Sequence, residues 1–339
     1  MRQVWIPRFG GPEVLTVREA DDPEAGPGEV RIRVAGAGVN FADVSARAGL
    51  YPDAPPPPMV VGYEVGGTVD QVGPDVDGLA VGDPVMALTR FGGYSDVVVV
   101  PAGQVARVHD GADLVEAAAI PVAFLTAYVM LDHLGSVRPG DTVLIHSAGG
   151  GVGLSALQLA KRLGAVTIGT ASAGKHQRLA EHGLDHAIDY RTEDFEAEVL
   201  RLTGGRGVEV VLDAQGGSSF RKSYRCLAPM GRLFCFGLAA GNAPKRSEAW
   251  RTLPKALATT PVFHPVQLMN ANKGVFGLNM GHLWDEGDRI GRFLTELAGR
   301  WERGEIAPVM DSTFPFTRAA DAHDQLGRAR NFGKVVLTP

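Results

Sequence analysis

The chain has 339 residues, of which 45% are hydrophobic and 21% charged, and it carries a net charge of -5. This length predicts about two domains, and the slightly acidic balance argues against a nucleic-acid partner or an anionic membrane surface. Two cysteines, no secretion signal and no apolar run of about 18 residues predict a cytoplasmic protein without a disulfide framework or membrane insertion.

Residues 1–120 are predicted to be rich in β-structure. Short apolar strands bordered by turn residues are expected at 30–34, 66–72 and 97–100. The proline run 55–58 favours a stiff polyproline II loop over a role in peptide recognition. From 113 to 133 the sequence is Ala-rich and predicts helix, with an interruption at Pro121.

From residue 142 onward, strands and helices alternate. Strands are predicted at 142–146, 166–170, 186–189, 208–213 and 232–236, and helices near 152–163, 175–182, 193–203 and 218–227. Such alternation predicts parallel strands joined by right-handed crossovers, which is a doubly wound α/β sheet. Residues 273–278 are expected to form a sixth strand.

Residues 242–272 do not follow this alternation. A helix is expected at 247–257, and we interpret the segment as a flap over a pocket, a dimer contact or a surface helix. The later segment 285–301 is amphipathic and predicts another helix. The last strand, Val335–Leu337, is expected to rejoin the first domain.

The segment Gly140–Lys161 has the pattern of a strand, a glycine turn and a helix. Its turn carries no bulky side chain, so backbone N–H groups can approach a phosphate, and the helix start adds free N–H donors and a positive dipole end. The spacing Ala148-x-Gly150-x-x-Gly153 is a degenerate dinucleotide fingerprint. Five residues are predicted to hold a cofactor pyrophosphate: Gly149, Gly150, Gly151, Val152 and Gly153. A tight turn in some other α/β protein is the alternative.

The end of the second strand indicates which cofactor is bound. A free ribose diol needs Asp or Glu about 20 residues past the glycines, whereas a 2′-phosphate needs hydroxyls and cations. Here Gly169 and Thr170 are followed by Ser172 and Lys175, without an acidic residue. This favours NADPH over NADH, and a solvated Lys175 is the alternative.

These motifs resemble a known family. Residues 140–161 are similar to the signature of zinc-free quinone oxidoreductases of the zeta-crystallin type, within the medium-chain dehydrogenase/reductase superfamily, although Gly149 stands where Ala or Ser is usual. Similar motifs occur at 27–30, 37–43, 49–52, 189–191 and 331–336. Residues 172–176, 229–231, 244–246 and 242–272 resemble the branch of vesicle amine transport protein homologues.

The resemblance implies a GroES-like β-rich catalytic domain formed by residues 1–121 and 287–339. It implies a Rossmann NADPH-binding domain at 122–286 and an active site in the cleft between the two. Members of the family are commonly homodimers joined through the sixth strand, here residues 273–278.

The superfamily's zinc enzymes bind the catalytic metal through Cys, His and a further Cys or acidic ligand. This sequence has Asn40 in place of the first Cys and Tyr63 in place of the His, and both cysteines lie in the Rossmann half. A catalytic zinc site needs three suitable protein ligands, so zinc is expected to be absent. Without a Lewis acid, hydride transfer to a double bond conjugated with a carbonyl is favoured over alcohol oxidation.

The resemblance also assigns residues to the site. Asn40 is expected beside the nicotinamide and the substrate carbonyl, with a turn-stabilising Asn as the alternative. Tyr51 is expected to line the substrate pocket and to donate a hydrogen bond or a proton, with a packed aromatic ring as the alternative. Asp43 is expected to orient Asn40 or the backbone, and Tyr63 to line the pocket or to fill the volume of the missing ligand. Further cofactor contacts are expected from Thr126, Tyr190, Gln215, Phe236, Gly237, Phe276, Leu278, Asn279, Arg328 and Asn331. Packing is the alternative role for Thr126 and the phenylalanines.

The leading hypothesis is therefore an NADPH-dependent reductase of quinones or α,β-unsaturated carbonyl compounds. A reductase of CoA-bound or carrier-bound enoyl thioesters is the second, and an NADPH-binding interaction protein without catalytic activity is the third.

Overall fold

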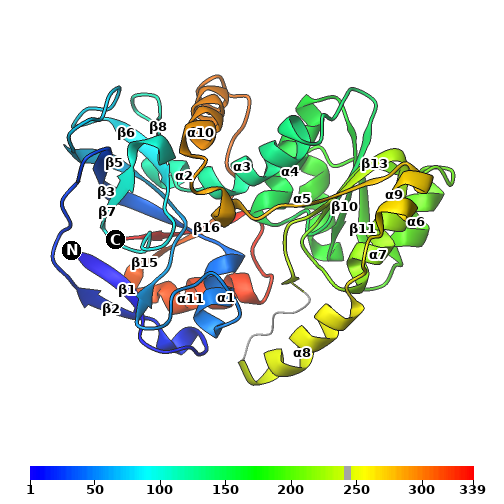
Figure 1. Ribbon diagram of the computed structural model, residues 1–339, viewed down its shortest axis with the longest axis horizontal. Helices are drawn as coiled ribbons and strands as arrows, with labels where there is room; N and C mark the ends of the chain where they lie inside the picture. Colours follow the sequence, from blue (N-terminus) through cyan, green and yellow to red (C-terminus); the bar gives the residue numbers. More distant parts are fainter. Residues whose placement is uncertain (240–245) are drawn as a thin grey trace. The chain divides into compact units, whose positions relative to one another are not determined.

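The computed structural model describes residues 1–239 and 246–339 and divides into two compact units (Figure 1). Within the described residues, unit 1 comprises 1–125, 246 and 280–339, and unit 2 comprises 126–239 and 247–279. The domain boundaries expected from the sequence, at 121/122 and 286/287, stay a prediction. The first part of the unusual segment 242–272, residues 242–245, lies outside the described residues.

Unit 1 is built around a sheet with the strand order β15-β16-β3-β5-β6-β8, in which β7 also pairs with β3. Its strands are β3 (Glu29–Val39), β5 (Glu64–Val72), β6 (Pro84–Leu88), β7 (Val97–Pro101), β8 (Val105–Arg107), β15 (Met310–Pro315) and β16 (Lys334–Thr338). A smaller sheet joins β2 (Thr16–Glu19), β1 (Arg2–Ile6) and β4 (Met59–Val60). The predicted return of the C-terminal strand is confirmed, because β16 pairs antiparallel with β3.

Strand β3 lies inside the main sheet of unit 1, and its first residues alternate between buried apolar and more exposed charged side chains. Val30 and Ile32 point to one face and are fully buried, while Arg31 and Arg33 alternate with them and form ion pairs with Asp70. Burial of apolar side chains on one face of the sheet supplies most of the stabilisation of such a layer.

The helices of unit 1 are α1 (Phe41–Ala48), α2 (Leu114–Ala117), the start of α3 (Pro121–Tyr128), α10 (Gly287–Glu302) and α11 (Ala319–Gly327). Helix α1 begins at the N-cap Asn40 and ends at Gly49, whose φ of 74° suits a glycine C-cap. Helices α1 and α11 lie side by side (Figure 1). Pro121 opens α3, which confirms the predicted interruption of the helical segment.

Unit 2 contains six parallel strands in the order β11-β10-β9-β12-β13-β14. They are β9 (Thr142–Ile145), β10 (Val166–Ala171), β11 (His186–Asp189), β12 (Val208–Asp213), β13 (Leu227–Cys235) and β14 (Gly274–Gly277). The helices are α4 (Gly151–Arg162), α5 (His176–Glu181), α6 (Phe195–Leu202), α7 (Ser218–Arg225), α8 (Arg246–Thr259) and α9 (Pro265–Ala271). The doubly wound sheet and its sixth strand are therefore confirmed, and Leu144, Ile168 and Val211 form its buried centre.

Several elements were not predicted from the sequence. Among the strands these are β1, β2, β4, β6, β8 and β15, and among the helices α1, α9 and α11. Strand β2 has four exposed residues, so it lacks the alternation that identifies a half-buried strand. Among the described residues, no helix is both long and apolar enough to cross a membrane.

Candidate functional site

The turn between β9 and α4 has the geometry expected of a phosphate-binding loop. Gly150 is the N-cap of α4, and its N–H donates to the Ser147 carbonyl at 2.9 Å. A Cβ on Gly153 would lie 2.4 Å from that same carbonyl oxygen, so the backbone packs too closely there for any side chain. The first N–H groups of an α-helix have no acceptor within the helix, so this turn presents donors suited to a pyrophosphate.

The strand order places this turn where a ligand is expected. Strands β10 and β11 lie on one side of β9, and β12, β13 and β14 lie on the other, which makes the end of β9 a topological switch point. Most of the predicted cofactor residues of unit 2 lie at or just after the carboxyl ends of these strands: Gly169, Thr170, Ser172, Tyr190, Gln215, Phe236, Gly237, Phe276, Leu278 and Asn279. Thr126 instead lies on α3 and is buried.

The end of β10 has the polar side chains of a phosphate site. Ala171 pairs with Asp189 of β11, so Ser172 and Tyr190 follow neighbouring strand ends. Ser172 caps a short 3-10 turn that ends with Lys175. The Tyr190 ring is 52% exposed, and the Arg191 guanidinium lies 5.9 Å from its centroid.

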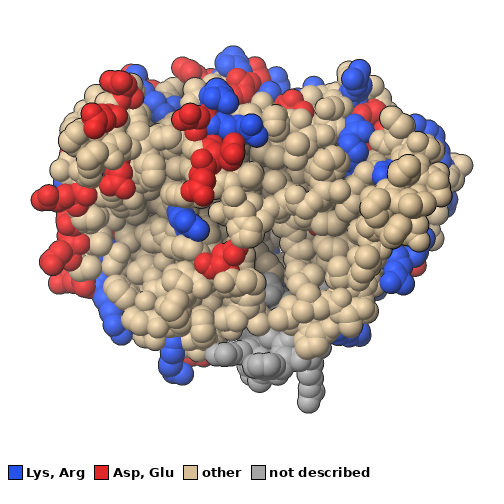
Figure 2. Space-filling model, viewed as in Figure 1, with Lys and Arg blue, Asp and Glu red and all other residues tan. Residues whose placement is uncertain are grey.

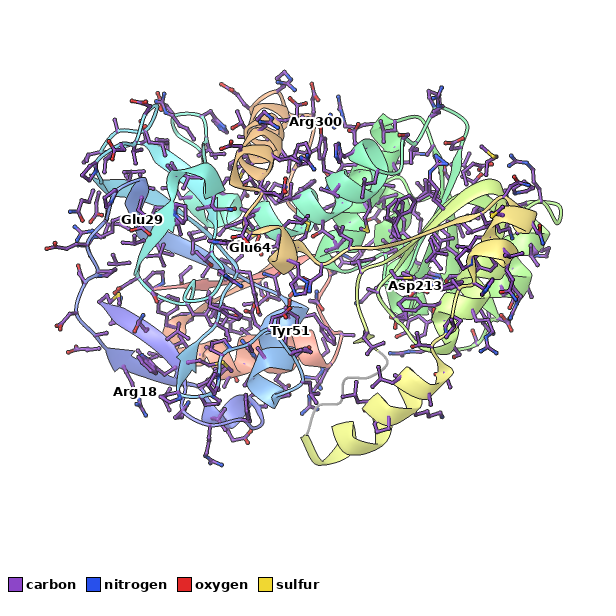
Figure 3. The ribbon with its side chains drawn as sticks, viewed as in Figure 1. Arg18, Glu29, Tyr51, Glu64, Asp213 and Arg300 are labelled. Atoms are coloured by element: carbon purple, nitrogen blue, oxygen red, sulfur yellow. The ribbon has the colours of Figure 1, made fainter. Side chains whose placement is uncertain are left out.

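Asn40 is the centre of a polar cluster in unit 1. Its amide Nδ2 donates to Glu64 Oε1 at 2.7 Å and to the Gly38 carbonyl at 3.3 Å, while Lys334 Nζ donates to its Oδ1 at 2.7 Å. Lys334 also forms an ion pair with Glu64, whose side chain is fully buried (Figure 3 labels Glu64). Both amide hydrogens of Asn40 are therefore directed to acceptors inside unit 1.

Asp43 is joined to the same cluster and has the predicted orienting geometry. Its carboxylate accepts the backbone N–H of Asn40 at 2.7 Å and that of Gly62 at 2.9 Å. Burial raises the pKa of Asp43 to about 7, against the two N–H bonds and the Lys334 charge, which act to lower it.

The two predicted pocket tyrosines lie together. The rings of Tyr51 and Tyr63 meet edge to face with centroids 6.0 Å apart, and Phe91 packs against Tyr63 at 5.2 Å. Burial raises the pKa of the Tyr63 phenol above its ordinary value. Tyr63 is thus a neutral, packed side chain, and both predicted roles, lining the pocket and filling the volume of the missing ligand, stay predictions.

The two C-terminal candidates of unit 1 differ in exposure. The Arg328 guanidinium bonds Asp324 at 2.6 Å and its side chain is 55% exposed. Asn331 is 4% exposed and its Nδ2 donates to the Gly333 carbonyl at 2.7 Å. Asn331 is therefore held inside its own loop, and only Arg328 offers an accessible charged group.

The donor set does not fit a catalytic zinc ion. The Asn40 amide is taken up by Glu64 and Lys334, the Tyr63 phenol is protonated, and the Lys334 ammonium already places a positive charge in this cluster. Among the side chains that the structure describes, those of residues 1–239 and 252–339, no three His, Cys, Asp or Glu are grouped as a metal would require.

Comparison with known proteins shows similarity over both units. Residues 26–110 match the family described as alcohol dehydrogenase GroES-like domain, and residues 182–337 match the family described as zinc-binding dehydrogenase. The synaptic vesicle membrane protein VAT-1 homolog of Rattus norvegicus is 40% identical over 345 residues, which covers 100% of this chain and 84% of that protein. A quinone oxidoreductase of Pseudomonas aeruginosa is 36% identical over 340 residues, covering 100% of this chain and 99% of the relative.

Solved structures agree with these matches. The Escherichia coli quinone oxidoreductase complexed with NADPH has a TM-score of 0.88 at 29% identity and is matched over the full length of both chains. The CurK enoyl reductase has a TM-score of 0.85 at 29% identity, with 99% of this chain and 98% of that chain covered.

The chain therefore belongs to the medium-chain dehydrogenase/reductase superfamily, a family of oxidoreductases. Within this superfamily its relatives include the VAT-1 homologues and the quinone oxidoreductases, as the sequence motifs predicted. The predicted pairing of a GroES-like unit with a Rossmann unit is confirmed.

Several polar residues that shape these sites were not identified from the sequence. Lys334 lies in the recognised motif 331–336 and Glu64 directly follows Tyr63, but no spacing rule indicates that they bracket Asn40. His146 and Asp213 each end or follow an apolar strand of unit 2, which is the one signal that could have marked them.

Proposed function

We propose that this protein is an NADPH-dependent, zinc-independent oxidoreductase that transfers hydride to a quinone or an α,β-unsaturated carbonyl compound. The observation that carries this proposal is the glycine turn at the switch point of the sheet, next to a strand end with Ser172 and Lys175 and no carboxylate. NADPH, when bound, supplies the hydride. The similarity to an NADPH-complexed quinone oxidoreductase supports the same cofactor.

The turn Gly149–Gly153 would hold the pyrophosphate through backbone N–H groups. Ser172 and Lys175 would hold the 2′-phosphate with a hydroxyl and an ammonium group. The remaining cofactor contacts stay proposals: Thr126, Gly169, Thr170, Tyr190, Gln215, Phe236, Gly237, Phe276, Leu278, Asn279, Arg328 and Asn331.

Tyr51 is the proposed donor for the oxygen of the reduced substrate. Negative charge develops on that oxygen when hydride is added to the conjugated carbon, and a hydrogen-bond donor there lowers the barrier. Asn40 could serve as this donor only by giving up its bond to Glu64 or to Gly38. We therefore assign Asn40 and Asp43 to positioning and Tyr63 to the pocket wall.

The function is tested by following NADPH oxidation with a 1,4-quinone, an enone and a short enoyl-CoA as acceptors. Turnover of the quinone or the enone is expected, and Tyr51→Phe should lower kcat about tenfold or more, which is typical of a lost transition-state donor. Turnover of enoyl-CoA with only trace rates on quinones would replace this proposal by the enoyl-thioester one.

The cofactor preference has its own test. Lys175→Ala is expected to raise the Kd of NADPH about tenfold while leaving that of NADH nearly unchanged, because the proposed partner of the lost charge is the 2′-phosphate, which NADH lacks. Arg178→Ala, in the following helix α5, serves as a matched loss of positive charge. Equal affinity of the parent protein for NADPH and NADH would contradict the assignment.

Reduction of an enoyl thioester is the second candidate, and the similarity to the CurK enoyl reductase favours it. A role as an NADPH-binding interaction protein is the third, and the names of the VAT-1 relatives motivate it. Binding of NADPH without its oxidation by any of the three acceptors would favour this third candidate.

We also propose a homodimer joined through residues 273–278. Strand β14 is an edge of the sheet in unit 2, and Phe276 on it is 38% exposed. Val262 and Met269, in the preceding segment, are 91% and 73% exposed. Sedimentation should show a dimer that Phe276→Asp dissociates and that Val81→Asp, at a 67% exposed position in unit 1, leaves intact.

The predicted division into a catalytic domain and a cofactor domain and the cytoplasmic location also remain proposals. Figure 2 shows acidic side chains gathered over the N-terminal part of unit 1, and the described residues of this face carry no continuous band of lysine and arginine. This surface gives no support to a nucleic-acid partner.

A further inference from the structure

A chain of buried polar side chains lies beneath the glycine turn in unit 2. His146 Nδ1 lies 3.0 Å from Thr170 Oγ1, and His146 Nε2 lies 3.0 Å from Ser223 Oγ. Ser223 Oγ in turn donates to Asp213 Oδ2 at 2.7 Å (Figure 3 labels Asp213). All four side chains are at most 3% exposed, so their hydrogen bonds must be satisfied within the protein.

Asp213 fixes the direction of this chain. Its carboxylate accepts hydrogen bonds from the hydroxyls of Ser219 and Ser223, at 2.7 Å each, and from the backbone N–H of Gln215 at 2.7 Å. A hydroxyl has one hydrogen. Since Ser223 gives its hydrogen to the carboxylate, its oxygen can only accept from His146, and Nε2 must carry the imidazole proton.

The tautomer of His146 then sets the orientation of Thr170. Burial lowers the pKa of His146, which keeps the ring neutral. With the proton on Nε2, Nδ1 is an acceptor, so the Thr170 hydroxyl donates to it. The Thr170 oxygen is left to accept the backbone N–H of Ser147, at 3.3 Å. The hydroxyl hydrogen of Thr170 is thus directed into unit 2 and not toward a ligand.

Ser147 is the residue that needs this support. Its φ of 54° lies in the left-handed region, which is unfavourable for a side chain other than glycine. Gln215 Nε2 donates to its hydroxyl at 2.7 Å, and the backbone of Gln215 is held by Asp213. The Ser147 carbonyl accepts from Gly150 and packs against Gly153, so the conformation of Ser147 decides where the first N–H groups of α4 point.

We propose that Asp213 and His146 are positioning residues for the cofactor: through Ser223, Thr170 and Gln215 they hold Ser147 in its left-handed turn and so aim the N–H groups of the glycine turn at the NADPH pyrophosphate. This inference rests on the proposed function, because it takes NADPH as the ligand. It assigns the Thr170 hydroxyl an indirect contribution to cofactor binding, beside the cofactor contact already proposed for this residue.

The first test compares two threonines of strand β10. Thr170→Val removes the hydroxyl that links His146 to Ser147, and the Kd of NADPH is expected to rise about tenfold, as the loss of one buried hydrogen bond implies. Thr170→Ser keeps the hydroxyl and should restore the affinity to within about threefold. Thr167→Val is the matched control, because Thr167 is also buried on β10 but bonds Asp185, toward the other end of the strand.

A merely structural role of Thr170 would be revealed by this comparison. Thermal unfolding of both valine variants measures their loss of stability. If Thr170→Val and Thr167→Val lower the stability alike and also change the Kd of NADPH alike, the positioning proposal is overturned. Asp213→Asn combined with Thr170→Val should raise the Kd little beyond either single change, because both act through the same chain.

A second measurement tests the direction of the chain without any cofactor. Nitrogen-15 NMR of the protein with labelled histidine is expected to show His146 with a protonated Nε2 and an unprotonated Nδ1, and Asp213→Asn should alter this signature. An Nδ1-protonated ring would overturn the proposal. If the parent protein binds no NADPH, the proposed function fails, and the tautomer still decides whether Asp213 orients this chain.

Discussion

Replacing Lys334 by methionine is expected to destabilise unit 1 by about 3–5 kcal/mol, the usual cost of removing one partner of a buried ion pair. The Glu64 carboxylate is fully buried, and without the ammonium group it would keep the Asn40 amide and the Val122 N–H as donors from the described part of the chain. The Asn40 oxygen would also lose its hydrogen bond from Lys334. Both losses occur where water cannot replace the missing group.

A matched lysine in unit 2 provides the control. Lys161 pairs with Asp185 at 2.8 Å, but its side chain is 36% exposed, so Lys161→Met should cost at most about 1 kcal/mol. Urea unfolding is followed by tryptophan fluorescence and by far-ultraviolet circular dichroism. Fluorescence reports mainly on unit 1, which contains Trp5, Trp284 and Trp301 of the four tryptophans, whereas circular dichroism reports on both units and so also detects a loss at Lys161. With a slope of about 2 kcal/mol per molar urea, Lys334→Met should lower the midpoint by about 1.5–2.5 M.

A second substitution should restore part of the lost stability. Glu64→Gln added to Lys334→Met removes the stranded charge and should recover part of the loss, although the glutamine amide cannot accept from both Asn40 and Val122. Equal losses for Lys334→Met and Lys161→Met would refute the argument. A double variant less stable than Lys334→Met would show that an unpaired Glu64 charge is not the main cost.

Two further predictions concern a buried acid and a glycine. Because burial raises the pKa of Asp43 to about 7, the folded state holds a proton that the unfolded state releases near pH 4, so this group's contribution to the stability of unit 1 should fall between about pH 4 and 7. When the pH is raised from 5 to 7.5, the urea midpoint should therefore fall more in the parent protein than in Asp43→Asn. A larger fall in the variant would contradict the expected direction of this pH dependence. Gly153→Ala should raise the Kd of NADPH at least about tenfold, because the added Cβ would lie 2.4 Å from the Ser147 carbonyl oxygen. Gly174→Ala is the control and should leave the Kd unchanged, because a Cβ at that position would meet open space. A normal Kd for Gly153→Ala in a fluorescence titration would show that the turn adapts.

The sheet of unit 2 could be predicted from the sequence because its signals are local. Strands buried on both faces read as apolar runs, and the helices between them change the period from 2 to 3.6. The three-stranded sheet and β15 of unit 1 could not be predicted, since all four residues of β2 belong to the exposed class and β15 carries polar residues on both faces. Their pairing depends on strands far away in the sequence.

The same distinction applies to the candidate sites. The glycine turn is readable because Gly150 and Gly153 act within a few residues of each other. The hydrogen-bond partners of the Asn40 amide cannot be predicted in this way, because Glu64 is 24 residues away in the sequence and Lys334 is 294 residues away. Sequence motifs placed Asn40 and Lys334 in the family pattern, but which atoms of Asn40 remain available is decided by tertiary packing.

Acidic residues in unit 2 show why free hydrogen-bonding capacity matters more than residue type at a strand end. Asp213 ends β12 and Asp189 ends β11, and either position could suggest a carboxylate for a ribose diol. Asp213 is occupied by two serine hydroxyls and the Gln215 N–H, and Asp189 accepts the Arg191 N–H at 3.1 Å and the Thr192 hydroxyl at 3.3 Å within its own turn. A carboxylate filled in this way orders the protein and has little left to offer a ligand. The end of β10 has no such acid, so a 2′-phosphate bound there would meet no negative charge from that strand end. The preference for NADPH therefore follows from the missing carboxylate at the end of β10.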